Sequence, residues 1–247
     1  MNPFKQLLKR SGSQPPIGIW LMSASPMLAE AAGHAGFDWG VIDMEHGPLD
    51  MGDVVHLLQA VAATKLVPIE LVPFVQTAEE AAAAVAATRY PPQGVRGMAG
   101  MCRAALYGTA SDHFATANRR MAVIVQLETE AALNRLEEIA AVDGVDALFV
   151  GPADLSGSMG LTGKVTHPKV MAAMADAARR CRAAGKPVGT IGGATEGVAQ
   201  FRAMGYGFLA AGSDIGHFVE SSQKAIQSLH SRETEHVHDL AGGTRPG

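Results

Sequence analysis

The sequence predicts an α/β fold, specifically a (β/α) barrel that is short of about one β/α unit near residue 70. Apolar runs of strand length alternate with helical segments along the whole chain, as expected of βαβ units and a parallel sheet. A length of 247 residues suits one barrel domain. Seven strands are predicted where a closed barrel needs eight, and the short interval lies near residue 70.

The strands are predicted from apolar runs that suit a sheet buried on both faces, and the helices from periodicity and capping residues. The predicted strands are 17–21, 37–43, 66–75, 121–127, 145–150, 186–191 and 207–213. The predicted helices are 3–11, 27–34, 51–63, 77–88, 111–119, 129–141, 166–184, 194–204 and 216–231. We expect one barrel domain over residues 1–231 and a polar, disordered tail over 232–247.

Composition excludes several classes of function. A formal net charge of −4 without a basic cluster gives no reason to expect a nucleic-acid partner. The apolar runs are far shorter than the ~20 residues of a membrane span, and the first residues lack the apolar core of a signal peptide. Cys102 and Cys181 have no metal-ligand spacing and are expected to be buried thiols. These features predict a cytoplasmic protein.

Two acidic residues follow successive predicted strands. Glu128 ends the run 121–127, and Asp154 follows the run 145–150 after a Gly-Pro-Ala break. Because parallel strands end at the same rim, both carboxylates are expected there, where α/β folds build their sites. Two carboxylates with substrate oxygens and water suit Mg²⁺ or Mn²⁺. The alternative is that each residue caps the helix or turn after it.

The strand 37–43 ends in a polar cluster that contains Asp43, Glu45 and His46. A histidine at a strand tip beside carboxylates has the surroundings of a general base, since negative charge stabilises imidazolium. The alternative is a loop histidine with a local hydrogen bond. Gln126 points to the same side of its strand as Glu128 and can donate to a carboxylate or carbonyl.

Four motifs then occur in order: 42–48 (Ile-Asp-Met-Glu-His-Gly-Pro), 89–97 (Arg-Tyr-Pro-Pro-Gln-Gly-Val-Arg-Gly), 125–129 (Val-Gln-Leu-Glu-Thr) and 149–156 (Phe-Val-Gly-Pro-Ala-Asp-Leu-Ser). Together they resemble the HpcH/HpaI family of metal-dependent class II pyruvate aldolases, over roughly residues 4–230. The resemblance implies a (β/α)₈ TIM barrel of the phosphoenolpyruvate/pyruvate type. It also implies a homo-oligomer, a hexamer built as a trimer of dimers with exchanged C-terminal helices.

The resemblance implies a role for each matching residue. Glu128 and Asp154 match the ligands of a divalent cation (Mg²⁺ or Mn²⁺, with Co²⁺ as a further candidate), and His46 paired with Asp43 matches the catalytic base. The substrate-binding residues that it implies are Trp20, Gln126, Gly151 and Ala153. The implied reaction cleaves a 4-hydroxy-2-keto acid to pyruvate and an aldehyde through a metal-stabilised pyruvate enolate. No Schiff-base lysine is needed.

The sequence departs from the family pattern at one place. Residues 65–69 resemble the start of the family's third strand, and residues 71–80 resemble the end of its fourth strand and the residues beyond it. About 20 residues of the pattern are absent between them. The arginine expected to bind the pyruvate carboxylate has no counterpart, and Glu70 has the opposite charge.

Several interpretations therefore stay open. The chain is an active aldolase with altered substrate handling, or a relative with weak or no catalysis that serves metal binding or assembly. A third interpretation is that the natural protein carries the complete unit. A CoA-ester lyase of the malyl- or citryl-CoA type is the other enzymatic candidate, although no nucleotide-binding signal is visible.

Overall fold

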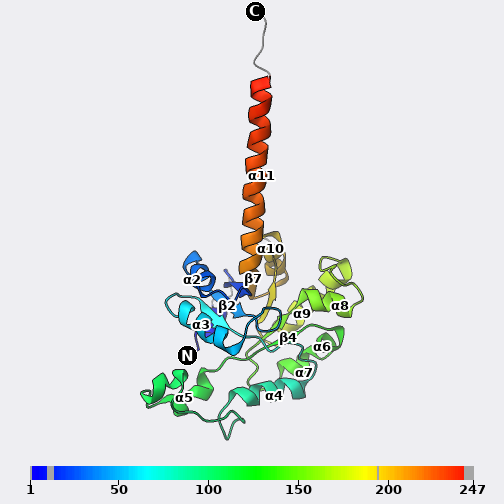
Figure 1. Ribbon diagram of the computed structural model, residues 1–247. Helices are drawn as coiled ribbons and strands as arrows, with labels where there is room; N and C mark the ends of the chain where they lie inside the picture. The colour runs from blue at the N-terminus through cyan, green and yellow to red at the C-terminus, as the bar shows by residue number, and fades with distance from the viewer. Residues whose placement is uncertain (1, 10–13, 194, 242–247) are drawn as a thin grey trace, which may run out of the picture.

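The computed structural model describes residues 2–9, 14–193 and 195–241, with side chains described as far as residue 231 (Figure 1). Seven strands form one parallel sheet in the order β3-β2-β1-β7-β6-β5-β4. The strands are β1 (Ile17–Leu21), β2 (Trp39–Ile42), β3 (Val67–Ile69), β4 (Ile124–Leu127), β5 (Ala147–Val150), β6 (Val188–Ile191) and β7 (Phe208–Ser213). The sheet curls into a barrel-like arrangement that lacks one unit, so the predicted number of strands is confirmed.

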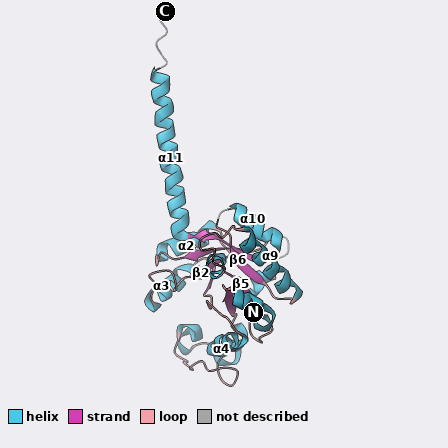
Figure 2. Cartoon of the chain, turned by 90° about the vertical axis from the view of Figure 1, so that its right-hand side faces the viewer, coloured by secondary structure: helices cyan, strands magenta, loops and turns pink. Residues whose placement is uncertain are grey.

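Helices surround the sheet and connect its strands (Figure 2). The first five are α1 (Pro3–Leu8), α2 (Pro26–Ala35), α3 (Met51–Val61), α4 (Ala78–Thr88) and α5 (His113–Arg120), with a 3₁₀ segment η1 (Arg103–Gly108) before α5. The others are α6 (Glu130–Asn134), α7 (Leu136–Ala140), α8 (Pro152–Ser158), α9 (Pro168–Ala183), α10 (Thr195–Met204) and α11 (Asp214–Ala241). The last of these, α11, projects away from the body of the molecule.

Aromatic side chains fill the space that the curled sheet encloses. Phe208 packs against Phe4, Trp39 and Phe149, with ring centroids 5.3, 5.7 and 6.0 Å apart. Phe4 belongs to α1, so this short helix closes the end of the sheet at which the strands begin. The opposite end, where the strands finish, stays open for a site.

The sheet closes on itself through one short segment. Strand β3 pairs with β2 as far as Ile69, and the chain then crosses to β4, where Val72 forms a bridge with Val125. Three backbone hydrogen bonds hold the crossing: from Val72 N–H to the Ile124 carbonyl (3.1 Å), from Gln126 N–H to the Val72 carbonyl (2.8 Å) and from Val75 N–H to the Gln126 carbonyl (3.1 Å). We call residues 67–75 the seam.

The prediction of a continuous strand over residues 66–75 is therefore wrong. The segment changes partner part-way, so neither neighbour is paired along its whole length. Pro68 and Pro73 have no N–H to donate, which limits pairing further. Phe74 turns the chain with a positive φ of 50°. A cavity of about 510 Å³, separate from the site described below, lies along the seam between α1 and the start of β4.

Other differences from the predictions are local. The helix predicted over 129–141 is divided at Arg135, whose φ of −106° and ψ of 15° are not helical. The segment η1 and the helix α8 were not predicted. Helix α11 begins at Asp214 and continues to Ala241, beyond the expected end at residue 231, while residues 242–247 of the predicted tail lie outside the described residues. No helix in the described part of the chain is long and apolar enough to cross a membrane.

Candidate active site

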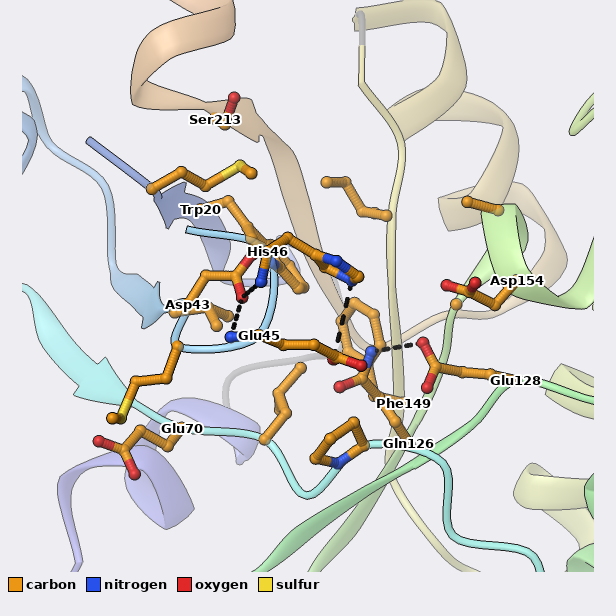
Figure 3. Close-up of a pocket in the computed structure, with 18 of the residues that line it drawn as sticks. Trp20, Asp43, Glu45, His46, Glu70, Gln126, Glu128, Phe149, Asp154 and Ser213 are labelled. Carbon is orange, nitrogen blue, oxygen red and sulfur yellow. Dashed lines mark hydrogen bonds and ion pairs between the residues drawn. The ribbon is translucent and has the colours of Figure 1, made fainter. Parts of the chain in front are cut away.

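A cavity of about 560 Å³ lies at the carboxyl ends of the strands (Figure 3). The residues that line it come from β1, β2, β4, β5, β6 and β7, from turns that follow several of these strands, and from residues 70, 71 and 73 of the seam. All eight residues that the sequence analysis assigned to a site line it: Trp20, Asp43, His46, Gln126, Glu128, Gly151, Ala153 and Asp154. The fold therefore brings together residues that are as far as 134 positions apart in the chain.

Glu128 is the most constrained acidic residue of the cavity. It follows β4 directly and is 2% exposed. Its Oε1 accepts a hydrogen bond from Gln126 Nε2 at 2.9 Å, and its Oε2 accepts one from the Phe74 N–H at 3.1 Å. A Cβ at Gly151 would come within 2.5 Å of Oε1, so this position needs glycine for the carboxylate to fit. Gln126, Phe74 and Gly151 thus constrain the Glu128 side chain from three sides.

Burial raises the pKa of Glu128 to about 7, because the desolvated carboxylate is harder to ionise. The negative charges of Asp154 and Glu45 raise this pKa further, whereas the Phe74 N–H and His46 oppose the rise. Asp154 is only half-buried and lies in the first turn of α8, beside Glu128 (Figure 3). Two carboxylates thus lie close together in a partly desolvated cavity.

This donor set fits a hard divalent cation. Both candidate ligands are carboxylates, and a cation between them would offset their mutual repulsion, which adds to the effect of burial on the Glu128 pKa. No group of three or more His, Cys, Asp or Glu residues suited to a metal occurs within the described ranges. Two carboxylates are nevertheless sufficient for Mg²⁺ or Mn²⁺ when substrate oxygens and water complete the coordination.

The alternative role for these acidic residues, helix capping, finds no support. The N-cap of α6 is Thr129, whose side chain accepts a hydrogen bond from the Ala132 N–H. Helix α8 begins at Pro152 after Gly151, and its N-cap residue makes no side-chain hydrogen bond. Glu128 and Asp154 are therefore available to the cavity.

His46 lies in the turn after β2, with its imidazole directed into the cavity (Figure 3). Its Nε2 is 3.7 Å from Glu45 Oε2, and its side chain is 55% exposed. The Asp43 carboxylate does not reach the imidazole ring: Oδ1 accepts hydrogen bonds from the backbone N–H groups of Glu45 (3.0 Å) and His46 (2.9 Å). Asp43 thus shapes the turn, and Glu45 is the carboxylate beside the ring.

One carboxylate oxygen of Asp43 has no hydrogen-bond partner among the described residues. Oδ2 of Asp43 is buried and accepts no hydrogen bond from the part of the chain that the structure describes. Buried polar groups are normally satisfied, by protein or by ordered water. The atom therefore leaves an acceptor free beside His46.

Three residues in or beside the cavity have charges or contacts that were not assigned to the site from the sequence alone: Glu45 as the partner of His46, Phe74 as a donor to Glu128, and Glu70. The Glu45 role could have been found, because it adjoins His46 in a strand-end turn. The Phe74 contact could not, because it depends on how the seam crosses to β4. Arg89 and Arg96 do not line the cavity; the Arg96 guanidinium lies over the Tyr90 ring, 4.7 Å from its centroid.

A family model described as HpcH/HpaI aldolase/citrate lyase matches residues 16–72 and 66–221. The chain belongs to this family. A solved family member from Burkholderia cenocepacia J2315 is 39% identical and covers 93% of this chain and 100% of its own, with a TM-score of 0.89. The fold and the sequence therefore agree on the family.

Curated relatives of this HpcH/HpaI chain are aldolases. A 2-dehydro-3,6-dideoxy-6-sulfogluconate aldolase of Pseudomonas putida is 43% identical over 248 residues, which cover 92% of this chain and 96% of the relative. A 5-keto-4-deoxy-D-glucarate aldolase of Salmonella paratyphi A is 38% identical over 249 residues, with the same coverage. These relatives support an aldolase, a lyase that acts on carbon–carbon bonds.

The comparisons also support the absence of one unit at the seam. The two segments matched by the HpcH/HpaI model overlap at residues 66–72, as expected when a chain lacks the part of the model that lies between them. The alignment with the Pseudomonas putida relative spans 248 positions but includes only 92% of this 247-residue chain. About 20 positions of the alignment therefore have no residue of this chain.

Proposed function

We propose that this HpcH/HpaI protein is a divalent-metal-dependent aldolase that cleaves a 4-hydroxy-2-keto acid to pyruvate and an aldehyde. The observation that carries the proposal is the convergence of Glu128, Asp154 and His46 on one cavity at the carboxyl ends of the strands. The family and its aldolase relatives give this constellation its chemical context. The barrel would then be of the phosphoenolpyruvate/pyruvate type.

Glu128 and Asp154 would hold the cation, with Mg²⁺ or Mn²⁺ preferred for their oxygen donors and Co²⁺ as a further candidate. When bound, the cation supplies Lewis-acid chemistry for the keto-acid end of the substrate. Gln126 keeps Glu128 oriented through its 2.9 Å hydrogen bond. Gly151 and Ala153 present backbone N–H groups beside the same carboxylates, and the Trp20 ring forms the floor with Phe149, at 5.3 Å between centroids.

His46 is the proposed base. Its imidazole takes the proton from the 4-hydroxyl group, the C3–C4 bond breaks, and the electron pair stays on the pyruvate part as an enolate while the aldehyde leaves. The imidazolium then gives this proton to C3, which yields pyruvate and restores the neutral base. The carboxylate of Glu45, 3.7 Å from the ring, stabilises the imidazolium that forms. Asp43 holds the turn so that the ring faces the cavity.

We also propose that the protein is a homo-oligomer, a hexamer arranged as a trimer of dimers. Helix α11 extends from the body and leaves large apolar side chains exposed along one chain segment. They are Ile215, Phe218, Val219, Ile226 and Leu229. Side chains of this kind on a projecting helix are suited to burial against another subunit.

The competing proposal is a relative with weak or no catalysis, which binds metal or serves assembly. Its support is the absence of any Lys or Arg among the described residues that line the cavity, since a keto acid needs its carboxylate neutralised. A CoA-ester lyase remains the other enzymatic alternative. A direct measurement of pyruvate enolisation separates these possibilities.

The test is the exchange of pyruvate methyl protons in D₂O, followed by NMR with and without Mg²⁺ or Mn²⁺. We expect exchange that depends on the cation and falls by about 10²–10⁴-fold in His46→Ala, while pyruvate binding changes little. His34→Ala is the matched control, because this exposed histidine of α2 lies outside the cavity. Exchange that is unchanged in His46→Ala would remove this residue from the mechanism.

A further inference from the structure

Gln76 joins the end of the seam to the two helices that begin beside it. It follows Val75, the last residue of the seam, and precedes the N-cap of α4. Its backbone N–H donates to Glu80 Oε2 at 2.6 Å, and its side-chain Nε2 donates to the Phe74 carbonyl at 3.4 Å. Its Oε1 accepts a hydrogen bond from Thr129 Oγ1 at 2.5 Å. One glutamine thus contacts α4, the seam and the start of α6.

Thr129 is the residue after Glu128, the proposed metal ligand. Its hydroxyl donates to Gln76 and also accepts a hydrogen bond from the Ala132 N–H at 3.0 Å, as the N-cap of α6. One residue earlier, Glu128 Oε2 accepts its hydrogen bond from the Phe74 N–H at 3.1 Å. Two hydrogen bonds therefore connect the end of the seam with this stretch, one to the carboxylate and one to the residue that follows it.

The backbone of Phe74 needs support to keep this arrangement. Its φ of 50° lies in the left-handed region, which a bulky residue adopts only at a cost in energy. Burial does not offset this cost, because the side chain is 44% exposed. The peptide group that follows Phe74 is held at both ends: its carbonyl accepts from Gln76, and its N–H, which belongs to Val75, donates to the Gln126 carbonyl at 3.1 Å. Such conformations persist where neighbouring contacts hold them in this way.

Resting on the proposed function, we infer that Gln76 and Thr129 are positioning residues for Glu128. Their hydrogen bond holds the end of the seam against the start of α6, so that the Phe74 N–H stays directed at Oε2 and the carboxylate keeps one orientation. Neither residue lines the cavity, so both act on the cation through Glu128. Residues that orient metal ligands in this way contribute about 10–100-fold to metal affinity.

The test measures Mn²⁺ binding to the full chain by electron paramagnetic resonance. Gln76→Met keeps the length of the side chain but removes both hydrogen bonds of its amide, and we expect Mn²⁺ to bind about tenfold more weakly. Gln93→Met is the matched control. The Gln93 Oε1 also accepts a side-chain hydrogen bond, from Asn118 Nδ2 at 2.8 Å, but this residue lies outside the cavity and away from Glu128. Its Mn²⁺ affinity should equal that of the wild type.

Variants of Thr129 test the other end of the same hydrogen bond. Thr129→Ser keeps the hydroxyl and the N-cap, so it should bind Mn²⁺ as the wild type does. Thr129→Val removes the hydroxyl and should weaken binding by about tenfold or more. Because Gln76→Met breaks the same hydrogen bond, the double variant should bind Mn²⁺ about as weakly as Thr129→Val alone. Losses that multiply would show that the two residues act separately, which would overturn the inference.

The exchange of pyruvate methyl protons is measured on the same samples. If the wild type neither binds Mn²⁺ nor exchanges these protons, the proposed function fails and the inference fails with it. If it binds Mn²⁺ without exchange, the proposed function fails, while the affinities of the variants still decide whether Gln76 positions Glu128. If the wild type does both but Gln76→Met binds Mn²⁺ as tightly as Gln93→Met, the inference alone is overturned.

Circular dichroism checks that each variant folds. If Gln76→Met does not fold, Gln76→Asn takes its place, because it keeps an amide but shortens its reach toward Thr129. The same loss of about tenfold in Mn²⁺ affinity is expected. Wild-type affinity in that folded variant would equally overturn the inference.

Discussion

Two parts of the same sheet differ sharply. Strands β4 and β5, which we call the wall, pair over four residues each, and all eight residues are buried. The seam crosses from β2 to β4 with a strand of three residues, none of them fully buried. Helices α7 and α9 cover the wall, whereas a cavity of about 510 Å³ runs along the seam.

The comparison shows where the chemistry of the site depends on packing. Glu128 and Asp154 follow the two wall strands, and the burial of those strands fixes where their carboxylates lie. The seam contributes the Phe74 N–H, which donates to Glu128, and the lining residues Glu70, Leu71 and Pro73. The proposed metal ligands thus follow two completely paired strands, whereas the shortened segment lies elsewhere along the cavity.

The largest contrast is expected in core stability. Leu148→Ala, at a fully buried position in β5, should lower the free energy of unfolding by about 2–5 kcal/mol, because it leaves a cavity in a close-packed layer. Leu71→Ala in the seam should cost about 1 kcal/mol or less, since that side chain is already partly exposed and borders open space. Urea denaturation measures both, and equal losses would contradict the distinction between wall and seam.

Metal affinity should follow the same division. Glu128→Gln removes a buried charged ligand, so we expect Mn²⁺ to bind about 100-fold more weakly or worse, measured by electron paramagnetic resonance or calorimetry. Glu70→Gln, across the cavity, is the matched control and should change Mn²⁺ affinity by about threefold at most. A comparable loss in both variants would place the cation nearer to the seam than we propose.

Restoring the missing unit should partly remove the contrast. A chimaera that receives the corresponding segment of about 20 residues from the Pseudomonas putida relative, inserted at Glu70, should cover the seam, and the family resemblance implies that the segment brings an arginine to the cavity. We expect about tenfold tighter pyruvate binding and faster proton exchange. If the native chain already turns over a 4-hydroxy-2-keto acid at about 1–10³ s⁻¹, the unit is dispensable.

The smallest effect concerns the outer layer of the wall. Arg180 of α9 pairs with Glu137 of α7 and lowers the pKa of that carboxyl to about 2. Because the folded-state pKa is lowered, the stabilisation is complete above about pH 4.5 and is lost as the pH falls toward 2. Glu137 is exposed and Arg180 is partly exposed, so water screens the pair and Glu137→Gln should cost about 0.2–1 kcal/mol at pH 7. This difference from the wild type should vanish near pH 2 in thermal unfolding curves.

Sequence reasoning succeeded best where local signals and burial agree. The run 145–150 and the Gly-Pro break after it predicted both the strand β5 and the position of Asp154 at its end. The same logic placed Glu128 after β4, and all eight assigned residues line one cavity. Their roles in binding and catalysis stay predictions.

It failed where the outcome depends on distant partners. Residues 66–75 look like one strand, yet their pairing changes from β2 to β4, and only the assembled sheet decides where the change occurs. The pairing of Asp43 with the His46 ring, which the family resemblance implies, stays a prediction: two N–H groups of the turn occupy Oδ1 of Asp43, and its Oδ2 has no hydrogen-bond partner within the described residues. Glu45 then takes the place beside the imidazole.

The three hydrogen bonds of the seam also decide how the ring of strands opens. Local opening of a protein proceeds where few contacts must be given up, and amide exchange reports that free energy residue by residue. The amides of Val72, Val75 and Gln126 span the junction next to β3, which is the one described strand without a buried residue. Phe74, which donates its N–H to Glu128, lies between Val72 and Val75, so we expect an opening of this junction to loosen the orientation of a proposed metal ligand as well.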